Sequence, residues 1–260
     1  MFYDNFTEDQ ICGLYTPWHF FAIAIFFISL AFVLFFTRKI NQKQRKVALL
    51  IIAIIVTVLE IVKIIIRIYK HESGDAWIPL YYCSMFLFAI WLVFAKNKYI
   101  STLGKVMVVF GGFFPSICYI LYPSTSLMIL PIWHPGSIHS LIYHWLMLYS
   151  ACLILKDYKP KAIHFVYYFS FVTIFTAIAA IVNHFLGTNM MFLSNPFGLE
   201  ILQSIFNYSK HLYAFLAYFA QAVILFWLQF GIFKLIELIY KKLKSRTKTK
   251  KDEVKENECI

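Results

Sequence analysis

Long, uninterrupted apolar runs are the feature of this sequence that most restricts its fold. Of the 260 residues, 61% are hydrophobic and only 14% are charged, a balance that soluble domains of this size do not have. Runs of about 20 apolar residues match the hydrocarbon thickness of a bilayer when they are helical. A membrane barrel would instead show shorter segments with strict alternation. The chain is therefore predicted to be an all-α membrane protein.

The breaks between the apolar runs predict seven transmembrane helices, because they fall at charged residues, prolines and glycines. The expected spans are 17–37, 46–69, 77–96, 101–122, 137–155, 161–186 and 204–241. The first run lacks a preceding basic region and a cleavage site, so we expect it to be retained. The predicted domains are an extracellular N-terminus at 1–16, a seven-helix membrane domain at 17–241 and a basic cytoplasmic tail at 242–260, expected to be disordered.

Lysine and arginine are concentrated in alternate loops, and this asymmetry predicts the orientation. The basic segments are 37–46, 96–105, 156–161 and the tail from Lys241, whereas the loops 122–137 and 187–196 contain no Lys or Arg and the N-terminus carries Asp4, Glu8 and Asp9. We therefore expect the N-terminus outside and the C-terminus in the cytoplasm, in the cell membrane. The net charge of +11 follows from these topology signals and does not indicate a nucleic-acid partner.

Polar side chains inside the predicted spans gather near their outer ends, and each is a functional candidate because burial in hydrocarbon is costly. Glu60, Lys63 and Arg67 share one face of the second helix. Cys83 and His144 are expected about 9 to 11 Å below the outer starts of the third and fifth helices. His19, Asn183 and His211 also fall in this layer, whereas His71, His134 and His139 lie in or beside loops and are left out. The pattern predicts a cavity that opens to the outer leaflet.

Cys83 and His144 at one depth suit acyl transfer, because a thiolate attacks a carbonyl and an imidazole carries the proton to the leaving group. Asn183 and Asn189 are candidates for oxyanion donors or for groups that fix a loop. The structural alternatives are an ordinary interhelical hydrogen bond for a buried histidine and a structural ion pair for Glu60 with Lys63. The five cysteines lack CxxC spacing and no paired-histidine motif occurs, so neither a metal nor a cofactor is predicted.

Four segments carry a family resemblance: "PWHFFAI" at 17–23, "IPLYYCS" at 78–84, "HSLIYHW" at 139–145 and "NHFLGTNMMFLSNP" at 183–196. Together they resemble the YwaF-like family of bacterial integral membrane proteins, over nearly the whole seven-span core. This family is similar to an animal seven-span acyltransferase that moves fatty acyl groups onto ether lysophospholipids, and more distantly to intramembrane lipid-ester hydrolases that use a Thr and a His.

The resemblance implies that Cys83 is the nucleophile, and it matches His144, His19, Asn183 and Asn189 to positions of the family pattern. The sequence departs from that pattern before the cysteine, where family members often have His and this chain has two tyrosines. It departs again at Met190, where they have Tyr.

The sequence therefore predicts an intramembrane lipid acyltransferase or acyl hydrolase that acts at the outer leaflet. Cys83 is the expected nucleophile and His144 the expected acid and base, with Glu60 and Lys63 orienting the site or binding a headgroup. The expected partner is a membrane phospholipid or lysophospholipid. The alternative is a non-catalytic small-molecule or lipid binding or transport protein of the same fold. Broken helices would favour transport, and the predicted spans are continuous.

Overall fold

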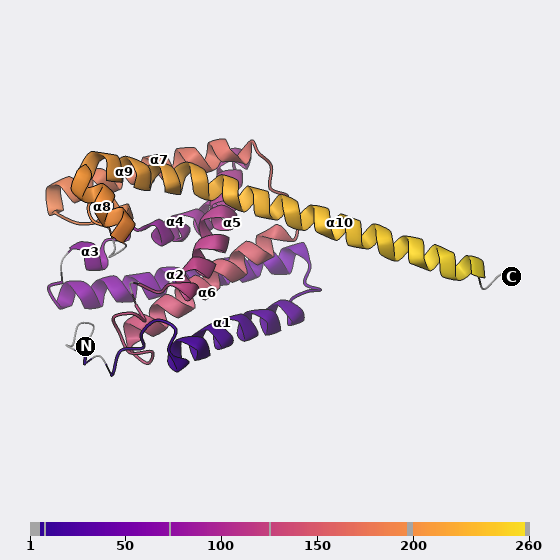
Figure 1. The fold of residues 1–260 in the computed structure, drawn as a ribbon, viewed down its shortest axis with the longest axis horizontal. Coiled ribbons are helices and arrows are strands. Elements are labelled where there is room, and N and C mark those ends of the chain that lie inside the picture. Colours follow the sequence, from indigo (N-terminus) through magenta and orange to yellow (C-terminus); the bar gives the residue numbers. More distant parts are fainter. Residues whose placement is uncertain (1–5, 8, 73, 125, 197–199, 258–260) are drawn as a thin grey trace.

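The computed structural model describes residues 6–7, 9–72, 74–124, 126–196 and 200–257. Asp4 and Glu8 of the expected acidic N-terminus, and Cys259 in the tail, lie outside these residues. Every regular element in the described part of the chain is a helix (Figure 1). The predicted all-α fold class is therefore confirmed.

The body of the fold consists of helices long and apolar enough to cross a membrane. They are α1 (Pro17–Phe36), α2 (Gln42–Tyr69), α5 (Lys98–Leu121), α6 (Pro135–Leu155), α7 (His164–Leu186) and a final span over Lys210–Lys242. α5 lies at the centre and packs against α6, α7 and the short helix α4 (Met85–Leu92). Glycine permits this packing: a Cβ added at Gly104 would come within 2.5 Å of the backbone nitrogen of Val93.

The third predicted span is the main departure from the sequence prediction. Instead of one helix over 77–96, the structure has a short helix α3 (Gly74–Trp77), a non-helical segment at 78–81, a 3-10 turn (Tyr82–Ser84) and then α4. Pro79 explains the break, because it has no N–H and it disfavours helical backbone at the preceding Ile78. The prediction of a continuous helix is therefore wrong, and Cys83 lies in the turn that begins α4.

The last predicted span, 204–241, is also divided. α8 (Glu200–Tyr208) ends before Ser209, whose hydroxyl accepts a hydrogen bond from the N–H of Leu212 and so caps α9 (Lys210–Phe219). A π-helical turn (Ala220–Ile224) then leads into α10 (Leu225–Asn257). α10 projects beyond the bundle (Figure 1), and the described part of the tail is helical where the sequence predicts disorder. Its Lys and Glu residues are strong helix formers.

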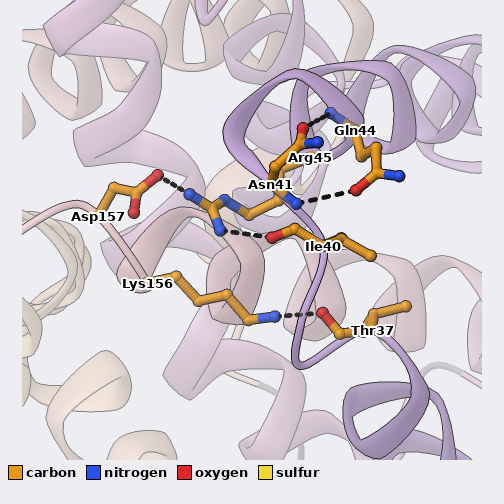
Figure 2. Close-up of polar contacts among 7 residues, drawn as sticks. All are labelled: Thr37, Ile40, Asn41, Gln44, Arg45, Lys156 and Asp157. Atoms are coloured by element: carbon orange, nitrogen blue, oxygen red, sulfur yellow. Dashed lines mark hydrogen bonds and ion pairs between the residues drawn. The ribbon is translucent and has the colours of Figure 1, made fainter.

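Two of the basic loops predicted to be cytoplasmic are tied together at one end of the bundle. Arg45, at the start of α2, forms an ion pair with Asp157, which follows α6, and Lys156 donates to the carbonyl of Thr37 at 2.7 Å (Figure 2). The side chain of Asn41 caps α2 beside them. These basic residues therefore have a structural role in joining α1 and α2 to α6. The orientation inferred from them stays a prediction.

Candidate functional site

A cavity of about 980 Å³ lies among α2, residues 81–84 between α3 and α4 (Met85–Leu92), and α6. The loop between α5 and α6 closes part of it through Ser124, Ile129 and Leu130, and Phe192 contributes from beyond α7. We call this space the α2–α6 cavity. Four of the eight site residues predicted from the sequence line it: Glu60, Lys63, Cys83 and His144.

Cys83 enters the cavity from the 3-10 turn that the break at Pro79 creates. Its side chain is half-buried, and its carbonyl accepts a hydrogen bond from the hydroxyl of Tyr143 on α6, at 3.4 Å. The turn is further fixed by the N–H of Ser84, which donates to the carbonyl of Tyr81 at 2.9 Å. The thiol is therefore presented by a short, anchored turn and not by the middle of a helix.

His144 is held in one orientation by two contacts. Its Nδ1 lies 2.8 Å from the carbonyl oxygen of Ser140, one turn earlier on α6. Its ring stacks on that of Tyr119, with centroids 3.6 Å apart and planes 4° from parallel. Because a carbonyl only accepts hydrogen bonds, Nδ1 must carry the proton, and Nε2 of the neutral ring then has a free lone pair. This arrangement leaves Nε2 of His144 suited to act as a base.

A stripe of paired charges runs along the α2 wall of the cavity. Glu60, only 3% exposed, forms an ion pair with Lys63. One turn further along, Arg67 pairs with Glu72 at 2.9 Å. Both pairs satisfy the rule that charges in an apolar environment occur with partners. Among the described residues, the cavity lining therefore includes two cations and two anions as well as Cys83.

His139 is a cavity residue that the sequence analysis left out as adjacent to a loop. Its Nε2 lies 3.8 Å from the Glu60 carboxylate and has no hydrogen-bond partner among the described residues. The sequence holds no spacing signal for it, because His139 and His144 are five residues apart on α6 and only residues three or four apart share a helix face. The cavity thus has two histidines, and one of them faces a carboxylate.

The other four predicted site residues lie elsewhere. His19 joins α1 to α5: its Nε2 lies 2.8 Å from the carbonyl of Ile120, and its Nδ1 accepts from the N–H of Tyr15. His211 is exposed on α9. Neither residue is among those that line the α2–α6 cavity.

Asn183 and Asn189 fix the loop that follows α7. Asn183 accepts from the N–H of Met190 at 2.7 Å and donates to its carbonyl at 3.0 Å. Asn189 accepts from the N–H groups of Ser194 and Asn195. Of the two roles considered for these amides, the geometry corresponds to loop fixing. Their effect on the cavity is indirect, because this loop carries Phe192 into the wall.

Comparison with known proteins supplies a family for this arrangement. The model of the TMEM164 family matches residues 14–231, a range that contains the whole α2–α6 cavity and all eight predicted site residues. No curated protein and no solved structure matches the chain. Since the family match covers most of the 260 residues, the chain belongs to the TMEM164 family.

Proposed function

We propose that this member of the TMEM164 family is an intramembrane lipid acyltransferase or acyl hydrolase. The observation that carries the proposal is the joint lining of one cavity by the Cys83 thiol and by a histidine, His144, whose Nδ1 contact with a carbonyl leaves Nε2 as a base. The resemblance of the sequence to YwaF-like proteins, and through them to a cysteine-dependent acyltransferase, supports the same assignment.

The proposed reaction begins when Nε2 of His144 takes the proton of the Cys83 thiol. The thiolate attacks the carbonyl carbon of a lipid ester, a thioester bond forms, and the ester C–O bond breaks. The departing alkoxide takes the proton from the imidazolium and leaves as an alcohol. In the second half, the hydroxyl of a lysophospholipid or a water molecule attacks the thioester, gives its proton to His144, and the Cys83 thiolate leaves and is reprotonated. Acyl transfer and hydrolysis therefore share one intermediate.

The lining of the cavity supports a lipid as the substrate. Val62 on α2 and Ile138 and Ile142 on α6 line it and are also exposed, so an acyl chain in the surrounding bilayer can reach the cavity from the side. Lys63 and Arg67 are suited to a lipid phosphate, because both donate charge-assisted hydrogen bonds. We propose a phospholipid or lysophospholipid of the cell membrane as the partner, approached from the outer leaflet in the predicted orientation.

His139 is the second histidine that a mutational test must separate from His144. Its Nε2 faces Glu60, a carboxylate that is able to orient an imidazole, whereas His144 is oriented by a backbone carbonyl. We assign His144 as the base because its Nδ1 contact leaves Nε2 without a proton. His139 then shares Glu60 with Lys63 and belongs to the charged wall.

A specific observation also favours the non-catalytic alternative, a lipid or small-molecule binding or transport protein. The third span is interrupted at Pro79, directly beside the cavity, and interrupted helices are typical of transporter binding sites. In this alternative the cavity binds the same ligand without a covalent step.

Covalent labelling separates the two functions. Purified protein in phospholipid vesicles is incubated with a thiol-reactive acyl probe, and the labelled peptide is identified. We expect labelling of the peptide that contains residue 83 to be lost in Cys83→Ser and to fall about 100-fold or more in His144→Ala, since a positioned base contributes at least that factor. The matched controls are Cys118→Ser and His184→Ala, which change exposed residues outside the cavity.

The outcomes differ between the candidates. Retained labelling in both controls and a smaller loss in His139→Ala support the proposed roles. Equal labelling of this peptide in wild type and Cys83→Ser would contradict the catalytic assignment. Saturable but fully reversible probe binding in every variant supports binding or transport.

A further inference from the structure

The last span contains a π-helical turn, Ala220–Ile224, whose Gln221 is hydrogen-bonded to Tyr168 and to Met191. Such turns have i→i+5 hydrogen bonds inside an α-helix and are frequent at functional sites. Here the hydroxyl of Tyr168, on α7, donates to the carbonyl oxygen of Gln221 at 2.7 Å. The π-helical turn therefore receives a hydrogen bond from α7 at Gln221.

The Tyr168 hydroxyl also connects this turn to the segment that carries Cys83. It is hydrogen-bonded to the hydroxyl of Tyr82, the residue directly before Cys83, and both tyrosines are buried. A phenol has one proton to donate, and Tyr168 gives its proton to Gln221. Tyr82 must therefore donate to Tyr168, and the chain Tyr82 to Tyr168 to Gln221 has a single direction.

The side chain of Gln221 forms a second connection, to the residue directly before Phe192 of the cavity lining. Its Nε2 donates to the carbonyl oxygen of Met191 at 2.9 Å. Met191 and Phe192 have φ angles of 54° and 56°, a left-handed conformation that is costly for residues other than glycine and that persists only where the surroundings fix it. Phe192 lines the cavity and packs against Tyr81, with ring centroids 5.4 Å apart.

We propose that Gln221 is a positioning residue that sets two parts of the cavity relative to each other. Its main-chain carbonyl fixes the Cys83 turn through Tyr168 and Tyr82, and its side-chain amide fixes Phe192 through Met191. The inference rests on the proposed function in one respect, namely that Cys83 is the reacting group. It explains why two tyrosines precede this cysteine. Tyr82 anchors the turn through its hydrogen bond to Tyr168, and Tyr81 packs against Phe192 of the cavity lining.

The two connections can be cut separately, because one uses a backbone atom of Gln221 and the other its side chain. Tyr168→Phe removes the hydroxyl and cuts the connection to the Cys83 turn. Gln221→Leu keeps the carbonyl and cuts only the connection to Met191. Gln221 Oε1 has no hydrogen-bond partner among the described residues. The replacement therefore removes no hydrogen bond of the side chain other than the one to Met191. Tyr218→Phe is the matched control, since its hydroxyl bonds Thr173 at 2.8 Å between α9 and α7.

The experiment measures the alkylation rate of Cys83 in full-length protein in vesicles, with the other four cysteines replaced by alanine. N-ethylmaleimide reports access to the thiol, and a maleimide with an attached acyl chain reports access through the cavity wall. We expect Tyr168→Phe to change both rates by about fivefold, the factor that corresponds to one neutral hydrogen bond. We expect Gln221→Leu to change the ratio of the two rates, and Tyr218→Phe to change neither.

The unfolding midpoint of each variant is measured in parallel, because a merely structural role would lower it without altering Cys83. Tyr82→Phe, which leaves the Tyr168 to Gln221 hydrogen bond intact, replaces Tyr168→Phe if that variant does not fold. Rates equal to those of Tyr218→Phe in all site variants would overturn the proposal. Shifted rates without any acyl labelling of wild type would keep the positioning role and remove the proposed reaction.

Discussion

Replacing Lys63 by methionine is the sharpest test of the charged wall, because it removes an ammonium group from a buried pair at nearly constant volume. The Lys63–Glu60 pair lies one turn of α2 from the Arg67–Glu72 pair, and the Glu60 side chain is only 4% exposed. After the substitution the Glu60 carboxylate has lost its ion-pair partner. Nε2 of His139 lies 3.8 Å from that carboxylate.

Removing one partner of a buried ion pair typically costs about 3–5 kcal/mol, because the remaining charge stays desolvated. We expect about 3 kcal/mol for Lys63→Met, the lower end of that range, since the imidazole of His139 can take up a proton and then pair with the carboxylate. The double variant Lys63→Met with Glu60→Gln removes the stranded charge as well. It should therefore be more stable than Lys63→Met alone.

Lys234 provides the matched control on the same kind of pair in an exposed position. It forms an ion pair with Glu237 three residues away, and the two side chains are 48% and 40% exposed. Lys234→Met should cost less than about 0.5 kcal/mol, as exposed pairs do. The measurement is the free energy of unfolding in mixed micelles for all four proteins. Equal losses for Lys63→Met and Lys234→Met would refute the assignment of a buried charged wall.

Two further predictions concern packing and the loop after α7. Gly104→Ala should destabilise the fold by about 2 kcal/mol, because the added Cβ meets the Val93 backbone nitrogen at 2.5 Å; Gly231→Ala, with nothing within 4 Å, should leave the unfolding midpoint unchanged or higher. Asn183→Leu removes both hydrogen bonds to Met190 and should cost about 2 kcal/mol and increase proteolysis within 187–196. Normal stability of Gly104→Ala, or unchanged proteolysis of Asn183→Leu, would contradict these assignments.

The membrane-spanning helices could be predicted because their signal is local. The expected span 17–37 is found as Pro17–Phe36, and 137–155 as Pro135–Leu155, since apolar length and helix-starting prolines act over a few residues. The break at Pro79 was missed because a proline fits either the first turn of a helix or the residue before one. In this structure Pro79 precedes the helix, and the segment is held by contacts distant in sequence, such as that of Tyr82 with Tyr168.

The candidate site was predicted in part for a similar reason. Estimated depth brought Glu60, Lys63, Cys83 and His144 into one group, and these four residues line the cavity. Depth alone does not show which polar groups are already satisfied. His19 uses both ring nitrogens in backbone contacts, a fact that depends on how α1 meets α5 and that spacing within one helix does not contain.

Detection of an acyl thioester on Cys83 tests the proposed chemistry most directly. Wild-type protein in vesicles is mixed with a phospholipid of known acyl composition, quenched with acid, digested and analysed by mass spectrometry. The proposed reaction predicts an added acyl mass on the peptide that contains Cys83, its removal by hydroxylamine, and its absence in Cys83→Ala. An acyl mass on a different residue, or none on any peptide while the lipid remains bound, would contradict catalysis by Cys83.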